Sequence, residues 1–307
     1  MTDEEKAEER EETGWKLVHA DVFRPPANYP MTFCVLAGSG VQLFFATLFS
    51  AVGFLSPANR GSLMIGMLMT FALLGFIFIA GFISARLYKT FKGKQWQKCT
   101  FVTAVLFPGT CFAIFFVLDI LVWADGSTGA VPLLSMLAIL ALWFGISVPL
   151  VFLGAFVGYK QEPITYPVVT SNIPRQIPDQ PSRLGFLSCM IGGGLLPFGS
   201  CFIELYYIKS SLWMDQYYFI FGFLLLTFII LAMTCIEVTI VVNCFQLCSE
   251  DYRWWWKAFF TAGSTAIYVF VYACYYFTRL QSTLFVTICL YFGYMFMACL
   301  GLFIMTG

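Results

Sequence analysis

Charged residues are scarce in this chain, because only 11% of its 307 residues are Asp, Glu, Lys or Arg, whereas 60% are hydrophobic. A soluble domain usually carries about a quarter charged residues. This scarcity excludes a soluble globular protein and indicates an integral membrane protein that contacts the lipid bilayer. The formal net charge of zero also excludes a strongly basic protein that binds nucleic acid.

Histidine is nearly absent, since His19 is the only one, and none of the eleven cysteines belongs to a Cys-x-x-Cys pair. Metal sites depend on such ligands, so we expect no metal and no other cofactor. Catalytic motifs are missing as well, which predicts a protein that is not an enzyme. We interpret the cysteines as small apolar side chains that fill space inside the spans. Cys244 and Cys248 lie near a predicted span end, where palmitoylation is the alternative.

Long polar stretches between the apolar segments are also missing, which leaves no room for a soluble domain. A helix needs about 20 apolar residues to cross a bilayer, and eight segments have that length. We therefore predict an all-α, polytopic integral membrane protein with eight transmembrane helices, several of them kinked by proline and glycine. The predicted spans are Phe33–Leu55, Ser62–Leu87, Thr100–Trp123, Val131–Tyr159, Leu184–Ile208, Tyr217–Leu247, Ala258–Phe277 and Thr283–Gly307.

Lysine and arginine are distributed very unequally between the two ends of these spans. If the N-terminus lies in the cytosol, the cytosolic side receives fourteen of the seventeen basic residues, and the other side receives only Arg60, Lys209 and Arg279. Cytosolic loops of membrane proteins carry such an excess of basic residues. We therefore predict that both termini are cytosolic.

The predicted spans divide the chain into four regions. Residues 1–32 form a cytosolic acidic tail and an interfacial segment, residues 33–159 hold the first four helices, and residues 184–307 hold the last four. Residues 160–183 contain five prolines, which block helix and favour an extended chain. We interpret this loop as a stiff cytosolic strap, with a docking segment for a cytosolic partner as the alternative. The last helix reaches Gly307 without a polar anchor, so we expect it to be truncated.

The segment before the first span mixes aromatic, basic and apolar residues, a combination that suits the headgroup layer of a bilayer. It reads Trp15-Lys16-Leu17-Val18-His19, followed by Asp21-Val22-Phe23-Arg24-Pro25-Pro26. The paired prolines prevent a continuous helix into the bilayer, so we expect the first span to begin after Pro30. A soluble linker is the alternative interpretation.

Carboxylates inside the predicted spans are candidates for function. Glu204 lies toward the outer end of the fifth span, and Glu237 lies about ten residues, or roughly 15 Å, inside the cytosolic edge of the sixth. A carboxylate at such a depth is usually protonated, paired or turned toward a polar cavity. We expect these two residues to contact a transmembrane client or to line a polar cavity; a packing hydrogen bond is the alternative.

Proline and glycine interrupt the fifth span, in the sequence Gly192-Gly193-Gly194-Leu195-Leu196-Pro197. Proline removes a backbone hydrogen bond, and glycine permits bending and close helix contact. The broken helices of transporters have this composition, although a kink packed against its neighbours is commoner. Pro197, Gly193 and Gly194 therefore join the candidate contacts for a client or a polar cavity.

Several of these segments together resemble the nonaspanins, the transmembrane-nine or EMP70 superfamily. The first is the stretch from Trp15 to Pro26, which we call the signature segment. The others follow in the same order as in that family and extend over nearly the whole chain. They are Ile173-Pro174-Arg175-Gln176-Ile177-Pro178-Asp179-Gln180, Gly193-Gly194-Leu195-Leu196-Pro197-Phe198-Gly199 with Ile203-Glu204-Leu205-Tyr206-Tyr207, Glu250-Asp251-Tyr252-Arg253-Trp254-Trp255-Trp256, and Tyr291-Phe292-Gly293-Tyr294.

The resemblance implies the eight-helix membrane block of this family, without its lumenal domain, its first helix and its cytosolic tail. It further implies a protein of Golgi and endosomal membranes that helps other membrane proteins reach the cell surface. Its partners would be membrane-protein clients, including those with glycine-rich transmembrane helices, together with cytosolic trafficking factors. The alternative is a secondary transporter or an ion-coupled, channel-like protein that uses Glu237 or Glu204.

Overall fold

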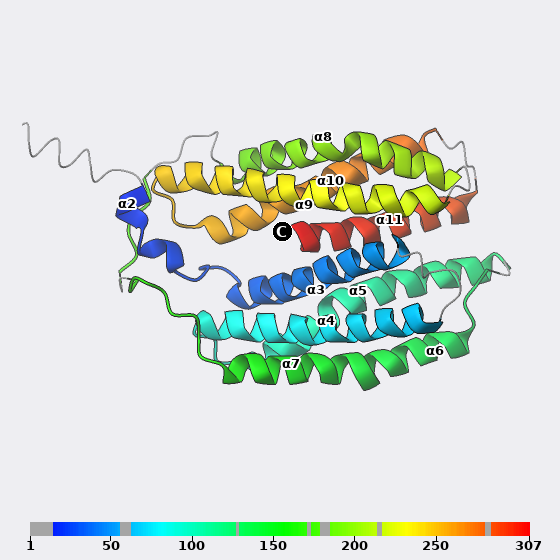
Figure 1. The fold of residues 1–307 in the computed structure, drawn as a ribbon, viewed down its shortest axis with the longest axis horizontal. Coiled ribbons are helices and arrows are strands. Elements are labelled where there is room, and N and C mark those ends of the chain that lie inside the picture. The colour runs from blue at the N-terminus through cyan, green and yellow to red at the C-terminus, as the bar shows by residue number, and fades with distance from the viewer. Residues whose placement is uncertain are drawn as a thin grey trace, which may run out of the picture.

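The computed structural model is all-α, and it describes residues 15–55, 63–126, 129–170, 173–178, 185–213, 217–279 and 284–307. Long helical rods run side by side through the molecule (Figure 1). Their bounds are α3 Pro30–Leu55, α4 Leu63–Thr90, α5 Trp96–Ala124, α8 Phe186–Trp213, α9 Tyr217–Cys248, α10 Trp254–Phe277 and α11 Phe285–Thr306. One further rod consists of α6 Leu133–Leu142, a π-helical turn over Trp143–Ser147, and α7 Val148–Lys160.

Seven helices in the described residues are long and apolar enough to cross a membrane. The 28-residue helix α4 is not among these seven, and the side chains of its first half lie outside the described residues. The chain is thus an all-α polytopic membrane protein, as the sequence predicts from its long apolar segments.

Helix ends differ from the predicted span ends by up to five residues. Helix α3 begins at Pro30 and not after it, because proline fits the first helical position, where its missing N–H is not needed. Helix α10 begins at Trp254 and not at Ala258. The predicted first residues of the fifth and eighth spans, Leu184 and Thr283, lie outside the described residues.

Four chain segments meet at the end of the molecule that α2 marks in Figure 1, and we call it the basic end. They are residues 15–29, 91–95, 161–170 and 249–253. Hydrogen bonds join the last turn of α4 to the end of α7 and the segment after it, since Lys89 Nζ donates to the carbonyls of Tyr159 at 2.8 Å and Gln161 at 2.6 Å. A series of membrane crossings requires the chain to reverse at alternate ends of the molecule. The basic end carries most of the described lysines and arginines.

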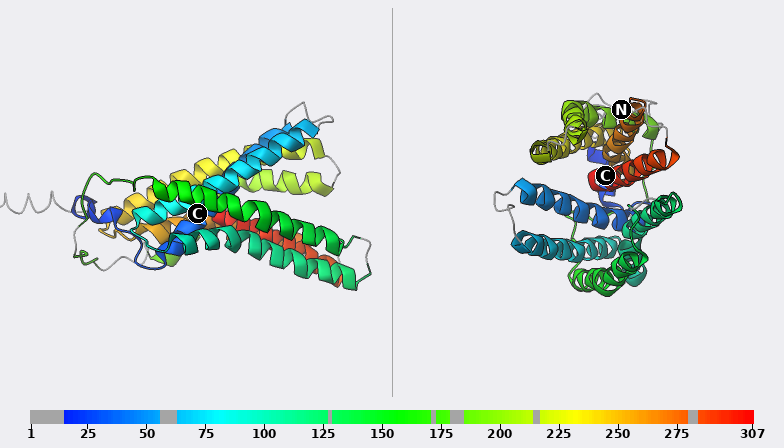
Figure 2. Two further views of the ribbon diagram at one scale, coloured as in Figure 1. Left: turned by 90° about the horizontal axis from the view of Figure 1, so that it is seen from below. Right: turned by 90° about the vertical axis from the view of Figure 1, so that its right-hand side faces the viewer.

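Close helix contacts and an aromatic core hold the bundle together. A Cβ atom at Gly154 of α7 would collide with the carbonyl of Phe78, and one at Gly81 of α4 with the carbonyl of Val151. Only glycine allows α4 and α7 to approach so closely. Nearer the basic end, Phe33 and Phe259 belong to a buried cluster that joins α3, α4, α5 and α10. The rods lie close together at this end and diverge toward the opposite end (Figure 2).

Candidate functional site

The signature segment is a structured part of the basic end. It forms the short helix α2 (Trp15–Val18) and a 3-10 turn over Asp21–Phe23. Arg24 Nη2 donates to Asp21 Oδ1 at 2.6 Å and closes the turn. The Phe23 ring stacks on Tyr166 of the strap, with ring centroids 4.6 Å apart. The strap and the segment therefore support each other.

Three consecutive tryptophans tie the signature segment and the residues after it to the start of α10. The indole Nε1 of Trp254 donates to the Val22 carbonyl at 3.0 Å, and that of Trp255 donates to the Arg24 carbonyl at 2.8 Å. Trp256 donates to the Asn28 carbonyl at 2.8 Å. Irregular backbone leaves such carbonyls without a helical partner, so each indole satisfies one of them.

Tyr29 connects this segment to α3 in an unusual backbone conformation. Its φ of 51° lies in the left-handed region, which a bulky residue seldom adopts. The bond from Trp256 to Asn28 and the start of α3 at Pro30 hold it on both sides. A residue in such a conformation costs roughly 1–3 kcal/mol of folding free energy, and residues of this kind cluster at functional sites.

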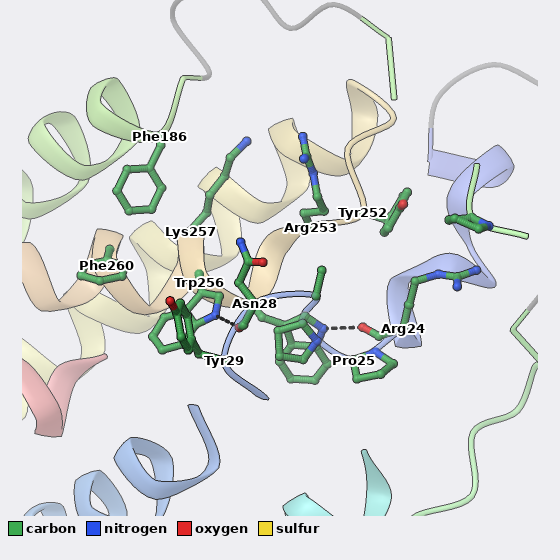
Figure 3. Close-up of a pocket in the computed structure, with 14 residues that line it drawn as sticks. Arg24, Pro25, Asn28, Tyr29, Phe186, Tyr252, Arg253, Trp256, Lys257 and Phe260 are labelled. Carbon is green, nitrogen blue, oxygen red and sulfur yellow. Dashed lines mark hydrogen bonds between the residues drawn. The ribbon is translucent and has the colours of Figure 1, made fainter. Parts of the chain in front are cut away.

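These elements enclose a cavity of about 740 Å³, which we call the interfacial pocket. Its walls come from the segment before α3, from the α9–α10 connection, from Pro174 of the strap, and from the first turns of α8 and α10. Aromatic rings supply much of the surface, and the cationic residues Arg24, Arg253 and Lys257 complete it. Figure 3 shows Arg253 and Lys257 extending to the same side of the pocket, with Phe186 and Phe260 on the side of Lys257 away from Arg253.

A buried carboxylate holds two of these cations in place. Asp251 is fully buried, and Lys257 Nζ donates to its Oδ2 at 2.7 Å. The backbone N–H and the guanidinium Nε of Arg253 donate to Oδ1 at 3.0 Å and 3.4 Å. Burial raises the pKa of Asp251, but its hydrogen bonds with Lys257 and Arg253 outweigh that effect and lower the pKa below its ordinary value. The carboxylate is therefore ionised at neutral pH and orients both cations.

Glu237 occupies the middle of the span Leu224–Cys248 on the outer surface of α9. Its side chain is exposed and has no hydrogen bond to the other described residues. Met233 and Ile240, about one turn away on either side, are 56% and 62% exposed. A carboxyl group in the centre of a span, surrounded by lipid-facing apolar side chains, is costly unless another polar group meets it.

Glu204 of α8 is half-buried, and its Oε2 atom is buried without a partner among the described residues. Ser200 of α8 donates to Thr234 Oγ1 of α9 at 3.4 Å, which fixes how these antiparallel helices are aligned. Glu204 and Glu237 lie about one helical turn beyond this contact in opposite directions, roughly 10 Å apart along the helix axis. The structure thus places both carboxylates on one helix pair but does not bring them together.

Gly193, Gly194 and Pro197 of α8 face the protein interior. A Cβ at Gly193 would collide with Thr261 of α10, and one at Gly194 would collide with Ser264. Pro197 is fully buried. In this structure these three residues therefore serve the packing of α8 within the bundle, whereas their neighbours Leu195 and Leu196 are exposed.

The cavity of about 290 Å³ beside α9 does not include Glu237 in its lining. Apolar side chains of α3, α9 and α11, such as Phe44, Phe228 and Met305, supply most of its walls. A transport pathway that uses Glu237 would need this carboxyl group to face such a space.

Sequence reasoning did not single out Lys257, Tyr29 or Phe186 as site residues. Lys257 directly follows the three tryptophans, and a cation beside aromatic residues at a span end is a recognisable signal for the headgroup layer. The positions of Tyr29 and Phe186 depend on tertiary packing, which nothing in the local sequence indicates.

A family model described as EMP70, Endomembrane protein 70, matches residues 1–285. The chain is similar to transmembrane 9 superfamily member 9 of Arabidopsis thaliana, with 53% identity over 309 residues that cover 99% of this chain and 48% of that protein. It is also similar to member 4 of Homo sapiens, with 48% identity over 302 residues that cover 97% and 47%. The chain thus spans about half the length of these relatives. No solved structure matches it significantly.

Proposed function

Because the chain belongs to the endomembrane protein 70 family, the transmembrane 9 superfamily, we propose that it helps to localise and sort other membrane proteins from Golgi and endosomal membranes to the cell surface. The clients dock through their transmembrane helices on the outer face of α9. The basic end and both termini lie in the cytosol, where the strap is accessible to trafficking factors.

The exposed carboxyl group of Glu237 is the observation that carries this proposal. It lies at the centre of a span, and no other described residue satisfies it. A polar group in lipid gains free energy when a second helix supplies a hydrogen-bond partner. A helix that lies against α9 and presents a hydroxyl or a backbone carbonyl to Glu237 provides that partner.

Glycine-rich client helices fit this face for a steric reason. Exposed side chains near Glu237, such as Met233, Ile236 and Ile240, are long, so a close approach needs small residues on the partner. Glycine and serine allow the two backbones to approach until polar atoms meet. A helix of large apolar residues would keep the carboxyl group away from any partner.

The experiment follows the surface delivery of a single-span reporter with a glycine- and serine-rich transmembrane helix, in cells that depend on this protein for that delivery. Glu237→Leu removes the polar group, whereas Glu237→Gln keeps an amide that can form the hydrogen bond. We expect Glu237→Leu to lower surface delivery and Glu237→Gln to keep most of it. Ile267→Leu, on the exposed surface of α10, is the control that should change nothing.

Two results would contradict the proposal. One is normal delivery with Glu237→Leu. The other is loss of function with Glu237→Gln, which is expected of a proton- or ion-coupled transporter because such a mechanism needs an ionisable group.

A further inference from the structure

We propose that the interfacial pocket is a binding site for an anionic glycerophospholipid, with its phosphate at Arg253 and Lys257 and an acyl chain along Phe186 and Phe260. This inference concerns the basic end of the molecule. It does not depend on the client face of α9.

Charge is the first argument. Three of the residues that line the pocket are cationic, Arg24, Arg253 and Lys257, and none of the described lining residues is acidic. Asp251 holds two of these cations from behind the wall of the pocket and is itself fully buried. The Arg253 side chain is 62% exposed, so its guanidinium remains accessible to an incoming anion. Basic pockets between transmembrane helices at the cytosolic side bind anionic headgroups.

The apolar surface is the second argument, and it favours a lipid over a free phosphate. Phe186 and Phe260 form a ring pair with centroids 5.3 Å apart, and Trp256 lies 5.8 Å from Phe260. Phe186 is the first residue of a membrane span, and it is 44% exposed. Figure 3 shows Phe186 and Phe260 on one side of Lys257 and Arg253 on its other side. A small hydrophilic anion gains nothing from such a surface, whereas an acyl chain does.

Position is the third argument. The pocket lies where α8 and α10 begin, and both helices are spans of the bilayer. Tryptophan and basic residues at a span end are characteristic of the headgroup layer. An amphiphile at this depth can place its phosphate at the polar edge while its chain remains in the hydrocarbon. The strained backbone of Tyr29 lies in the same wall.

The test uses the full chain purified in detergent and native mass spectrometry with added phosphatidylserine or phosphatidylcholine at equal concentration. We expect phosphatidylserine to occupy one site more strongly than phosphatidylcholine. Arg253→Gln should lower this occupancy about fivefold, which is the typical effect of one cation near an anionic headgroup. Phe186→Ser should lower the occupancy as well, because the acyl chain loses a contact.

Matched changes at the opposite end serve as controls. Arg279 is an exposed arginine and Leu284 is an exposed apolar residue next to a span, so Arg279→Gln and Leu284→Ser should leave the occupancy unchanged. Arg253→Gln leaves the bond between Lys257 and Asp251 intact, and the melting temperature of the variant verifies that it folds.

Three results would overturn the inference. Unchanged phosphatidylserine binding in both Arg253→Gln and Phe186→Ser would exclude this pocket. Equal binding of phosphatidylcholine would exclude recognition of a net anionic lipid. Displacement of the lipid by glycerol 3-phosphate at the same concentration would show a site for a free phosphate and no role for the acyl chain.

Discussion

Asp251 is a buried charge whose stabilising effect depends on pH. Its pKa is lowered in the folded protein, so its contribution to the free energy of unfolding is fully present above its unfolded value, about 3.9. The contribution is lost as the pH falls through the folded pKa. We expect the contribution of Asp251 to stability to stay constant between pH 5 and 8 and to decrease below about pH 4.

Asp251→Asn removes the charge but keeps the size of the side chain. Lys257 then faces a neutral partner inside the protein, and we expect the variant to lose about 3 kcal/mol of stability at pH 7. Heat-induced unfolding in detergent, followed by tryptophan fluorescence from pH 7 to pH 3, measures both effects. Asp125→Asn at the opposite end, where the side chain is exposed, should behave like the unchanged protein. Equal melting temperatures of Asp251→Asn and the unchanged protein at pH 7 would show that the network is not stabilising.

Sequence spacing predicts the depth of Glu237 but not the direction of its side chain. Its distance from the cytosolic edge follows from counting residues along a helix, which is a local property. Whether it faces the bundle or the lipid depends on how α9 rotates against α8, and α9 is apolar on all sides. The same holds for Gly193 and Gly194, whose contact with α10 is set by tertiary packing.

At the scale of helices, α4 and α7 owe their close contact to glycine. Gly154→Ala introduces a methyl group against the Phe78 carbonyl, and we expect it to lower the stability of the protein by about 1–3 kcal/mol. Gly199→Ala is the matched control, because nothing lies within 4 Å of a Cβ at that position. It should be neutral or stabilise the protein by about 0.5–1 kcal/mol, since alanine is the better helix former. Thermal unfolding of both variants in one detergent compares them, and an unaffected Gly154→Ala would rule out the close contact.

The helices themselves are predictable from the sequence because a long apolar run in a membrane protein has few alternatives to a helix. The ends of these helices are less predictable from the sequence. Lys92 and Glu250 follow α4 and α9 with φ of 59° and 62°, in a position that glycine usually occupies. Backbone bonds from Gly93 to Tyr88 and from Asp251 to Gln246 close these helix ends without a glycine at the turn. The local sequence therefore carries no clear stop signal.

For the whole molecule, the alternation of the chain between two ends determines which segments share a side of the membrane. Flexible inserts with an N-glycosylation acceptor test it, placed after Gly93 or Val169 at the basic end and after Gly126 at the other. We expect only the insert after Gly126 to be glycosylated, because the excess of Lys and Arg at the basic end predicts that this end faces the cytosol. Glycosylation at either insert of the basic end would reverse or break this topology.

The unequal distribution of Lys and Arg predicts this arrangement from the sequence, and the structure gathers residues 15–29, 91–95, 161–170 and 249–253 at one end. The interfacial pocket at that end was not predictable. It needs the signature segment, the strap and the first turns of α8 and α10 to meet, and the signature segment and the start of α10 are more than 200 positions apart in the sequence. Only the tertiary contacts of the tryptophans reveal it.

Site-directed photocrosslinking from α9 tests most directly whether a client helix docks beside Glu237. A photoreactive residue replaces Ile240 on the exposed face of α9, or Val271 on the exposed face of α10 as the control position. The partner is a single-span reporter whose transmembrane helix is rich in glycine and serine. We expect crosslinks from position 240 only, lowered roughly three- to twentyfold by Glu237→Leu, as expected for an interhelical hydrogen bond of about 0.6–1.7 kcal/mol. Equal crosslinking from both positions, or no effect of Glu237→Leu, would contradict docking on this face.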